Sequence, residues 1–148
     1  MLKRLKADES GMTLIEITIV IVILGLLASF IAPRVLSAPD KAKVAKAKQE
    51  LAALENALQM YSIAVGDYPT TEQTLQALWK IPNPPPENWD GPYVTKPGFK
   101  DPWGRDYVYV SPGNHEGYDF DLSSLGKDGK EGGEGFDADL TNWVEETE

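Results

Sequence analysis

Near its amino terminus the chain carries an apolar run that is interrupted by one carboxylate and ends at a proline. It reads GMTLIEITIVIVILGLLASFIAP, residues 11–33. As a helix, the 21 residues from Met12 to Ala32 would extend about 31 Å, which matches the roughly 30 Å hydrocarbon core of a bilayer. We therefore predict a membrane-spanning helix over residues 12–35, and this segment limits the classes of protein to be considered.

Two simpler interpretations of this segment are a cleaved secretory signal and a plain single-span anchor. A secretory signal is followed by a small-x-small cleavage site, but the only candidate, residues 36–38, begins with Leu36 and is followed by Pro39. A plain anchor gives no role to Glu16, a carboxylate that is costly in an apolar segment unless it is paired. We therefore treat Glu16 as a candidate functional residue and keep the anchor as an alternative.

The composition excludes several classes of function. The 148 residues carry 14 basic and 23 acidic side chains, a formal net charge of −9. Residues 101–148 alone contain 13 acidic and 3 basic side chains, which is the wrong sign for a nucleic-acid surface. The chain has no cysteine and one histidine, His115, so disulfides, thiolate metal sites and most triad chemistry are excluded. We expect no nucleic-acid partner and no enzymatic activity.

The order of residues at the start of the chain carries a specific resemblance. A Lys-rich leader precedes Gly11-Met12-Thr13-Leu14-Ile15-Glu16, and an apolar helix containing Pro33 follows. This arrangement resembles the class III signal of type IV pilins and pseudopilins, with Met12 where most members have Phe. The resemblance implies that a prepilin peptidase cuts between Gly11 and Met12, removes the leader 1–11 and methylates the new amino terminus of Met12.

The same resemblance assigns assembly roles to Glu16 and Pro33. After cleavage the amino group of Met12 would be a cation one helical turn from Glu16. The two could pair at i,i+4, or Glu16 could reach the amino terminus of a neighbouring subunit. Such pairing is the least costly way to keep a carboxylate in apolar surroundings. Pro33 removes one helix hydrogen bond and would kink or loosen the helix.

Residues 40–65, after expected breaks at Pro33 and Pro39, have the periodicity of an amphipathic helix. Apolar residues alternate at spacings of three and four, at Val44, Ala47, Leu51, Leu54, Leu58, Tyr61 and Val65. This pattern predicts a helix that packs on a sheet of the same domain. A coiled coil has the same pattern, but three heptads are thin evidence for one. Gly66 ends the helix.

The sequence beyond this helix predicts short elements connected by loops. Residues 70–73 have the pattern of a capping box that opens a short helix over 71–79. Residues 107–110 and 118–122 are expected to pair as strands across a turn at 114–117, which contains His115. One long helix and a small antiparallel sheet make an α+β fold, and by the resemblance above it is type IV pilin-like, with a globular head over 36–148.

Residues 123–143, SSLGKDGKEGGEGFDADLTNW, are rich in glycine and acidic side chains and cannot pack by themselves. They could form a solvated acidic loop or a calcium loop, because Ca²⁺ takes about six to eight oxygen ligands. An EF-hand starting at Asp121 would need Glu where Gly132 stands, and one starting at Asp128 has Lys130 and Gly132 where ligands belong. A calcium β-roll would need a repeat, which the sequence lacks.

This segment does resemble the carboxy-terminal calcium loop of major pseudopilins in type II secretion. Residues 68–78 likewise resemble the stretch after their long helix, with Thr74 where that family usually has Gly. The resemblance implies Ca²⁺ as a cofactor. The implied ligands are the carboxylates of Asp128 and Asp139, the carbonyl oxygens of Leu125 and Leu140, and an oxygen of Asp137. Trp143 would pack over the closed loop and couple the metal to the core of the head.

The resemblance covers residues 11–33, 68–78, 101–107 and 125–143 in one order and implies a mechanical function. Such a subunit polymerises into a periplasmic pseudopilus that drives folded proteins across the outer membrane. The implied partners are copies of itself, minor pseudopilins, an inner-membrane assembly platform and the prepilin peptidase. The implied location is the inner membrane, crossed once, with the head in the periplasm. Alternatives are a minor pseudopilin, a Cys-free type IV pilin, or a membrane-tethered calcium module that never polymerises.

Overall fold

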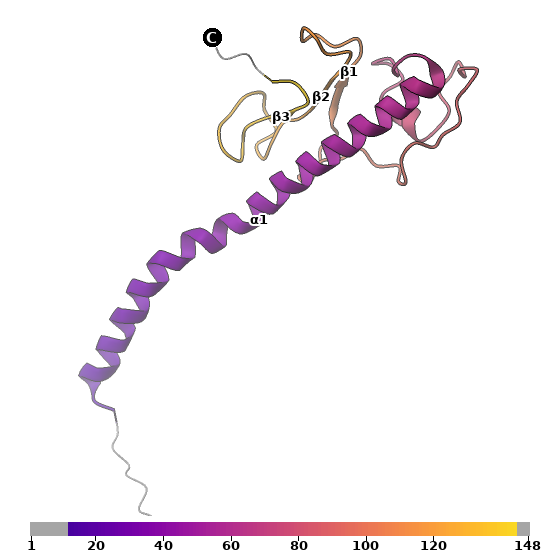
Figure 1. Cartoon of the computed structure of the whole chain (residues 1–148). Helices are drawn as coiled ribbons and strands as arrows, with labels where there is room; N and C mark the ends of the chain where they lie inside the picture. Colours follow the sequence, from indigo (N-terminus) through magenta and orange to yellow (C-terminus); the bar gives the residue numbers. More distant parts are fainter. Residues whose placement is uncertain (1–11, 145–148) are drawn as a thin grey trace, which may run out of the picture. The chain divides into compact units, whose positions relative to one another are not determined.

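The structure, a computed structural model, describes residues 12–144, with the backbone alone for residues 31–36. Its elements are α1 (Leu14–Val65), the 3₁₀ turn η1 (Leu75–Leu78), β1 (Val108–Val110), β2 (Asp121–Ser124) and β3 (Leu140–Thr141) (Figure 1). The chain divides into two units, Met1–Ala38 and Pro39–Glu148, and the second unit, called the head below, holds the sheet. The predicted combination of one long helix and a small antiparallel sheet is confirmed.

Helix α1 begins directly after Thr13 because this residue caps it. The Thr13 hydroxyl oxygen accepts a hydrogen bond from the Glu16 N–H (3.3 Å), and the Glu16 carboxylate accepts one from the Thr13 N–H (3.4 Å), which together make a capping box. The helix then continues to its end without interruption. The breaks predicted at Pro33 and Pro39 are therefore wrong. Each proline removes only one main-chain donor, and the turns on both sides maintain the helix.

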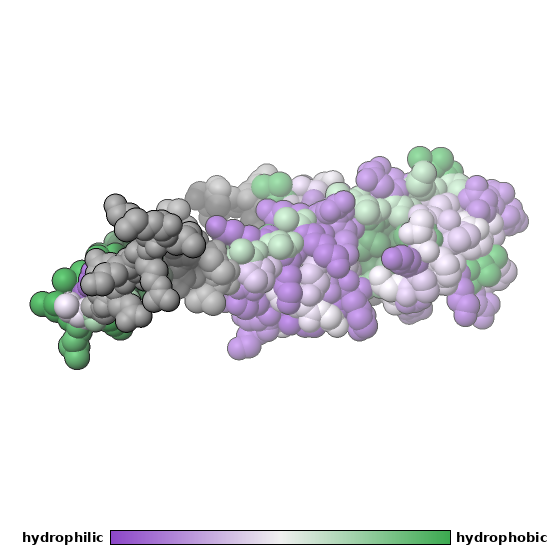
Figure 2. Space-filling view, turned by 90° about the horizontal axis from the view of Figure 1, so that it is seen from below, coloured by the Kyte–Doolittle hydropathy of each residue, from purple (hydrophilic) through white to green (hydrophobic). Residues whose placement is uncertain are grey.

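The first part of α1 is apolar on every side. All side chains from Met12 to Phe30 are exposed, with Leu14 at 86% and Phe30 at 70%. In Figure 2 the visible part of this segment is mostly green, whereas much of the visible face of the head is purple. No helix in the part of the chain that the structure describes is long and apolar enough to cross a membrane. The membrane-spanning half predicted for residues 12–35 is thus not confirmed.

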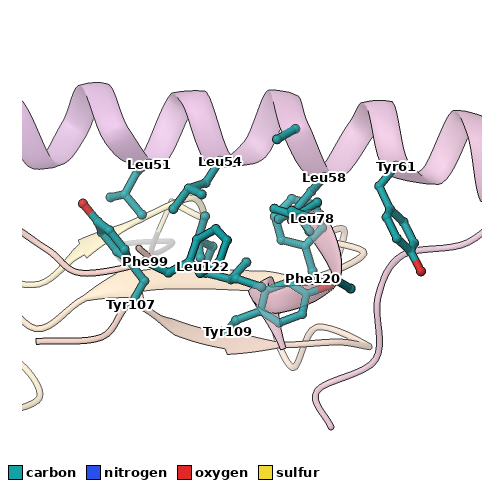
Figure 3. Packing of buried hydrophobic residues seen from close by; sticks show 13 residues of the cluster. Leu51, Leu54, Leu58, Tyr61, Leu78, Phe99, Tyr107, Tyr109, Phe120 and Leu122 are labelled. Carbon is teal, nitrogen blue, oxygen red and sulfur yellow. The ribbon is translucent and has the colours of Figure 1, made fainter. Parts of the chain in front are cut away.

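The core of the head forms where the apolar stripe of α1 meets the sheet (Figure 3). The predicted stripe is buried at Ala47, Leu51, Leu54, Leu58 and Tyr61. It packs on Leu78 of η1 and on Tyr109 and Leu122, which lie opposite each other in β1 and β2. Full burial of a leucine such as Leu58 contributes about 1.5–3 kcal/mol. The stripe therefore packs on a sheet of its own domain, as the periodicity predicts.

The sheet is antiparallel, with the strands in the order β1-β2-β3. Its second strand is Asp121–Ser124, later in the chain than the predicted residues 118–122. The difference arises because the connection from β1 is longer than a tight turn. The Gly113 N–H donates to the Asp119 carbonyl (2.9 Å), and the Asp121 carboxylate accepts from the Asn114 N–H (2.8 Å). These bonds hold the residues before Asp121 as a loop.

Strand β3 was not predicted, because only two residues form it. The side chain of Asn142 extends its pairing with β2. The carboxamide oxygen accepts from the Leu122 N–H (2.7 Å), and the carboxamide nitrogen donates to the Phe120 carbonyl (3.0 Å). The Asn142 N–H also donates to the Leu122 carbonyl (3.0 Å). Asn142 thus ties the end of the described chain to the central strand.

The helix predicted over 71–79 is reduced to the single turn η1. The capping box is present, since Thr70 and Gln73 exchange side-chain-to-backbone hydrogen bonds of 3.0 and 3.3 Å. Thr74, however, has a φ of 55°, outside the right-handed helical region. A regular helix cannot pass through that residue, so the chain turns once and starts again as η1.

Candidate functional site

The residues between β2 and β3 form a loop with a first arm, residues 125–129, and a second arm, residues 133–139. The two arms lie close together at Gly126, and the second arm folds back on itself at Gly133. A Cβ on either glycine would lie 2.6 Å from a main-chain carbonyl oxygen of the second arm. Both residues also have a positive φ, which glycine adopts without strain. The glycines of this segment are therefore required by the path of the loop.

Hydrogen bonds join residues on opposite sides of the loop, and the part of the loop that they bridge is called its neck below. The Lys127 N–H donates to the Phe136 carbonyl at 3.0 Å. The Gly132 N–H donates to the Asp139 Oδ2 at 2.9 Å. A segment that cannot pack a core of its own is thus held together by hydrogen bonds between its own residues.

Two of the five predicted calcium ligands, Leu125 and Asp139, line one cavity of about 600 Å³ between the sheet and the loop. The Asp139 Oδ1 is buried and has no hydrogen-bond partner among the described residues. The Leu125 carbonyl accepts from the Gly129 N–H at 3.0 Å, and a carbonyl oxygen has a second lone pair. These two residues are therefore available to a ligand in the cavity.

The other three predicted ligands, Asp128, Asp137 and Leu140, do not line this cavity. Asp128 and Asp137 are exposed, and the Asp128 Oδ1 accepts from the Lys130 N–H at 3.1 Å. Leu140 belongs to β3, where it lies opposite Ser124. Within residues 12–144, no three His, Asp or Glu side chains lie together as possible ligands of one metal ion. The structure thus brings two of the predicted ligands together and leaves three outside the cavity.

The donor set fits Ca²⁺ in its chemistry. Every predicted ligand atom is a carboxylate or carbonyl oxygen, the kind that this hard cation prefers. A buried polar atom without a partner costs about 1–3 kcal/mol, and a charged one costs more. The unpaired oxygen of Asp139 therefore favours a site for a cation at the neck of the loop.

Trp143 also lines the cavity, where its ring stacks on that of His115. The ring centroids are 3.9 Å apart and the planes are inclined by 16°. The His115 Nδ1 lies 3.0 Å from the Asp121 Oδ2. Trp143 was expected to pack over the loop, and it lies beside the loop while also contacting the turn after β1. A lone histidine in a turn gives no sequence signal of such a distant stacking partner.

A buried carboxylate next to the loop was also missed from the sequence. The Asp101 side chain is 1% exposed and accepts hydrogen bonds from the Trp103 N–H, the Arg105 N–H and the Ser124 hydroxyl at 2.8–3.0 Å. Arg105 donates to the carbonyl oxygen of Gly126. The first arm is thereby attached to the turn at 101–105. The Asp-Pro-Trp-Gly pattern signals the turn but not the burial of its aspartate.

The predicted processing and assembly residues belong to the start of the chain. Gly11 lies outside the described residues. Met12 and Glu16 are exposed, and Glu16 pairs with Thr13, a partner that was not singled out although Thr-x-x-Glu is the spacing of a capping box. Pro33 lies within α1. The roles predicted for these residues remain predictions.

Two families match this chain. Residues 34–143 match the family described as type II secretion system (T2SS), protein G. The chain belongs to the protein G family of type II secretion. In this family member, residues 6–32 also match the prokaryotic N-terminal methylation motif, which spans the predicted cleavage point and most of the apolar run.

Relatives of this protein G family member match over nearly their whole length. The type II secretion system core protein G of Pseudomonas aeruginosa is 49% identical over 140 residues, which are 93% of this chain and 97% of that protein. The core protein G of Vibrio cholerae is also 49% identical, over 91% of this chain and 92% of that protein. The family inferred from the sequence is confirmed.

A solved structure gives the same result for the fold. The crystal structure of the major pseudopilin from the type 2 secretion system of enterohaemorrhagic Escherichia coli is 40% identical to this chain and matches with a TM-score of 0.59. The match covers 73% of this chain and 92% of that chain. The pilin-like fold expected for this protein G family member is therefore confirmed.

Proposed function

We propose that the chain is the structural subunit of a periplasmic pseudopilus, which it builds by polymerising with copies of itself. The observation that carries this proposal is the change of environment along α1. Its side chains from Met12 to Phe30 are all exposed and mostly apolar, whereas the same helix buries a stripe against the sheet from Ala47 onward. Apolar surface of this extent needs lipid or other copies of the segment around it. A bilayer before assembly and a filament core after assembly supply both.

In this proposal the inner membrane holds the subunit by residues 12–35, and the head lies in the periplasm. The prepilin peptidase removes residues 1–11, which the match to the methylation motif supports. An inner-membrane platform then adds subunits below minor pseudopilins, and the growing filament drives folded proteins across the outer membrane. The role is mechanical, and we propose no catalytic step for the chain.

Glu16 has the central part in assembly. In the uncleaved chain its carboxylate caps α1 through Thr13. After cleavage the new ammonium group of Met12 can pair with this carboxylate at i,i+4, in the same subunit or the next. An unpaired carboxylate in apolar surroundings is costly, so the requirement for a partner fixes the axial position of one subunit against its neighbour.

The test compares filament yield and leader removal in three variants. Glu16→Ala and Glu16→Gln should still insert and be processed, but they should form far fewer filaments. A loss of about 1.4 kcal/mol per added subunit lowers the equilibrium constant of each addition about tenfold. Thr13→Ala is the matched control, because it removes the cap and keeps the carboxylate. A normal filament yield with Glu16→Ala would contradict the proposal and favour a membrane-tethered module.

We further propose that the carboxy-terminal loop binds Ca²⁺ through Leu125, Asp128, Asp137, Asp139 and Leu140. The support is the all-oxygen donor set together with the buried, unpaired oxygen of Asp139 beside Leu125. The bound ion would supply the positive charge that the unpaired oxygen of Asp139 lacks. The chain contributes the rest, since its glycines let the two arms meet and Trp143 links the loop to the turn after β1.

Thermal melting of the full chain in detergent tests this site, with calcium, magnesium or a chelator. Calcium at 100-fold above its Kd should stabilise the folded chain by about 2.7 kcal/mol. Asp128→Ala and Asp139→Ala should abolish that gain, and Asp137→Ala should reduce it less. Magnesium should substitute poorly, because it prefers a smaller octahedral and largely hydrated site. Asp119→Ala, an exposed carboxylate outside the loop, is the control. Equal melting with calcium and chelator would leave the segment a solvated acidic loop.

A further inference from the structure

The first arm of the loop is attached to helix α1 by an ion pair. The Lys127 Nζ donates to the Asp40 Oδ2 at 2.8 Å, and the two residues lie 87 positions apart in the sequence. Asp40 belongs to α1, directly after the start of the head at Pro39. Its side chain is largely covered, at 22% exposed, and that of Lys127 is 48% exposed. One lysine therefore connects the loop to the part of α1 where the head begins.

Lys127 stands at a special place in the loop, between the predicted ligands Leu125 and Asp128. Its N–H holds the Phe136 carbonyl across the neck, while its side chain reaches Asp40. Both arms of the loop and α1 thus meet at a single residue.

A charged lysine inside a calcium loop opposes the metal, because like charges a few ångströms apart repel. Asp40 offsets this in two ways. Its carboxylate neutralises the ammonium, and it draws the side chain toward α1. Lys130, the other lysine of the segment, is exposed and has no carboxylate partner in the part of the chain that the structure describes. The two lysines therefore differ in whether a carboxylate pairs with the side chain.

We propose that Asp40 is a positioning residue for the calcium loop and that it holds the first arm against α1 through Lys127. The consequence is a coupling between metal binding in the loop and fixation of the turn of α1 that follows Pro39. By linkage, calcium strengthens the ion pair by the same factor as the ion pair strengthens calcium binding. This inference rests on the calcium site proposed above.

A double-mutant cycle on the full chain in detergent tests the coupling, with CaCl₂ as the titrant in calorimetry. Asp40→Asn alone should weaken calcium binding roughly three- to fivefold, the scale of a partly exposed ion pair. In the Lys127→Met background the same change should alter the Kd by less than about 1.5-fold, because the carboxylate then has no partner. Calcium should also slow hydrogen exchange of amides 40–46 in the wild type, and it should do so less in Asp40→Asn.

Two controls remove the same charges elsewhere. Lys130→Met deletes the unpaired lysine of the same segment, and Asp119→Asn deletes an exposed carboxylate of the head. Neither change should show a coupling like that between Asp40 and Lys127. Equal weakening by Asp40→Asn in both lysine backgrounds, or no weakening in either, would overturn the proposal. A wild type that fails to bind calcium would refute the calcium site and this inference together. Binding without coupling would refute this inference alone.

Discussion

Thr74 holds the backbone before η1 in a conformation that a β-branched residue rarely adopts. Its φ is 55° and its ψ is −177°, a region occupied almost only by glycine and costing other residues about 1–3 kcal/mol. The Thr74 hydroxyl offsets part of this cost, because it accepts a hydrogen bond from the Gln76 N–H at 3.2 Å. The residue is thus both strained and useful as a cap.

Replacement of Thr74 separates these two effects. Both Thr74→Gly and Thr74→Ala remove the capping hydroxyl, but only glycine relieves the backbone. We expect Thr74→Gly to stabilise the head by about 1 kcal/mol and Thr74→Ala to destabilise it by about 1 kcal/mol. Urea denaturation of both variants measures the difference. Glycine is ordinarily the less stable of the two, so an alanine variant as stable as the glycine variant would disprove the strain.

Two buried tyrosines predict how the stability of the head depends on alkaline pH. Burial raises the pKa of Tyr109 to about 12. The pKa of Tyr107 is raised in the same direction by burial and by the Glu50 carboxylate, to which its hydroxyl donates at 2.9 Å. Above the unfolded pKa of about 10, the folded chain therefore binds more protons than the unfolded chain. Its stability should be complete below pH 10 and fall as the pH rises toward 12.

Tyr109→Phe tests this dependence. The Tyr109 hydroxyl donates to the Pro69 carbonyl at 2.7 Å, so its loss should cost about 1 kcal/mol at pH 7. Phenylalanine does not ionise, and the difference between the two proteins should shrink above pH 10 and then reverse. Urea denaturation at a series of pH values from 7 to 11.5 measures both curves. Parallel curves over that range would contradict the raised pKa.

At the scale of elements, α1 combines two environments on one continuous helix. Its first part is apolar all round, and its second part has a buried stripe and an exposed face. Packing of an amphipathic face supplies most of the stability of a helix in a protein. The stability of the head should therefore depend on the stripe and be nearly indifferent to the opposite face.

Two alanine substitutions on α1 check this division. Leu58 is 0% exposed, and Leu58→Ala should destabilise the head by about 2–5 kcal/mol. Ile63 is 84% exposed, and Ile63→Ala should change stability by less than about 0.5 kcal/mol. Thermal melting of both variants under the same conditions gives the comparison. A large loss with Ile63→Ala would mean that another surface covers that face of the helix.

At the scale of the whole molecule, the proposed removal of the leader would decide which form of the chain assembles. The proposed cleavage after Gly11 would lie before the apolar helix, so it would remove the leader and keep that helix. We expect the mature protein to have the mass of residues 12–148 plus one methyl group. Gly11→Leu should leave a full-length precursor in the inner membrane, because the restrictive position of the signal is lost. Intact-mass measurement of both proteins decides, and a normal mature mass for Gly11→Leu would refute the assigned cleavage point.

Most of what could be predicted from the residues rests on local physics. The apolar run, the spacing of the stripe from Ala47 to Tyr61, and the capping box at Thr70 each depend on neighbours within one or two turns, and the structure contains all three. The chemistry of the loop is equally local, since glycines and carboxylates in one short segment already favour a hard cation. The family followed from such motifs and their order.

Only the tertiary structure decided which distant residues meet. The pairing of β3 with β2, the stacking of His115 on Trp143, the burial of Asp101 and the ion pair of Asp40 with Lys127 leave no periodic signal in the chain. Each joins residues that are not neighbours in the sequence, and each forms only when the folded head brings its segments together. The sequence around either residue does not reveal such a contact. Bringing the two residues together costs loop-closure entropy, and the packing of the whole core offsets that cost.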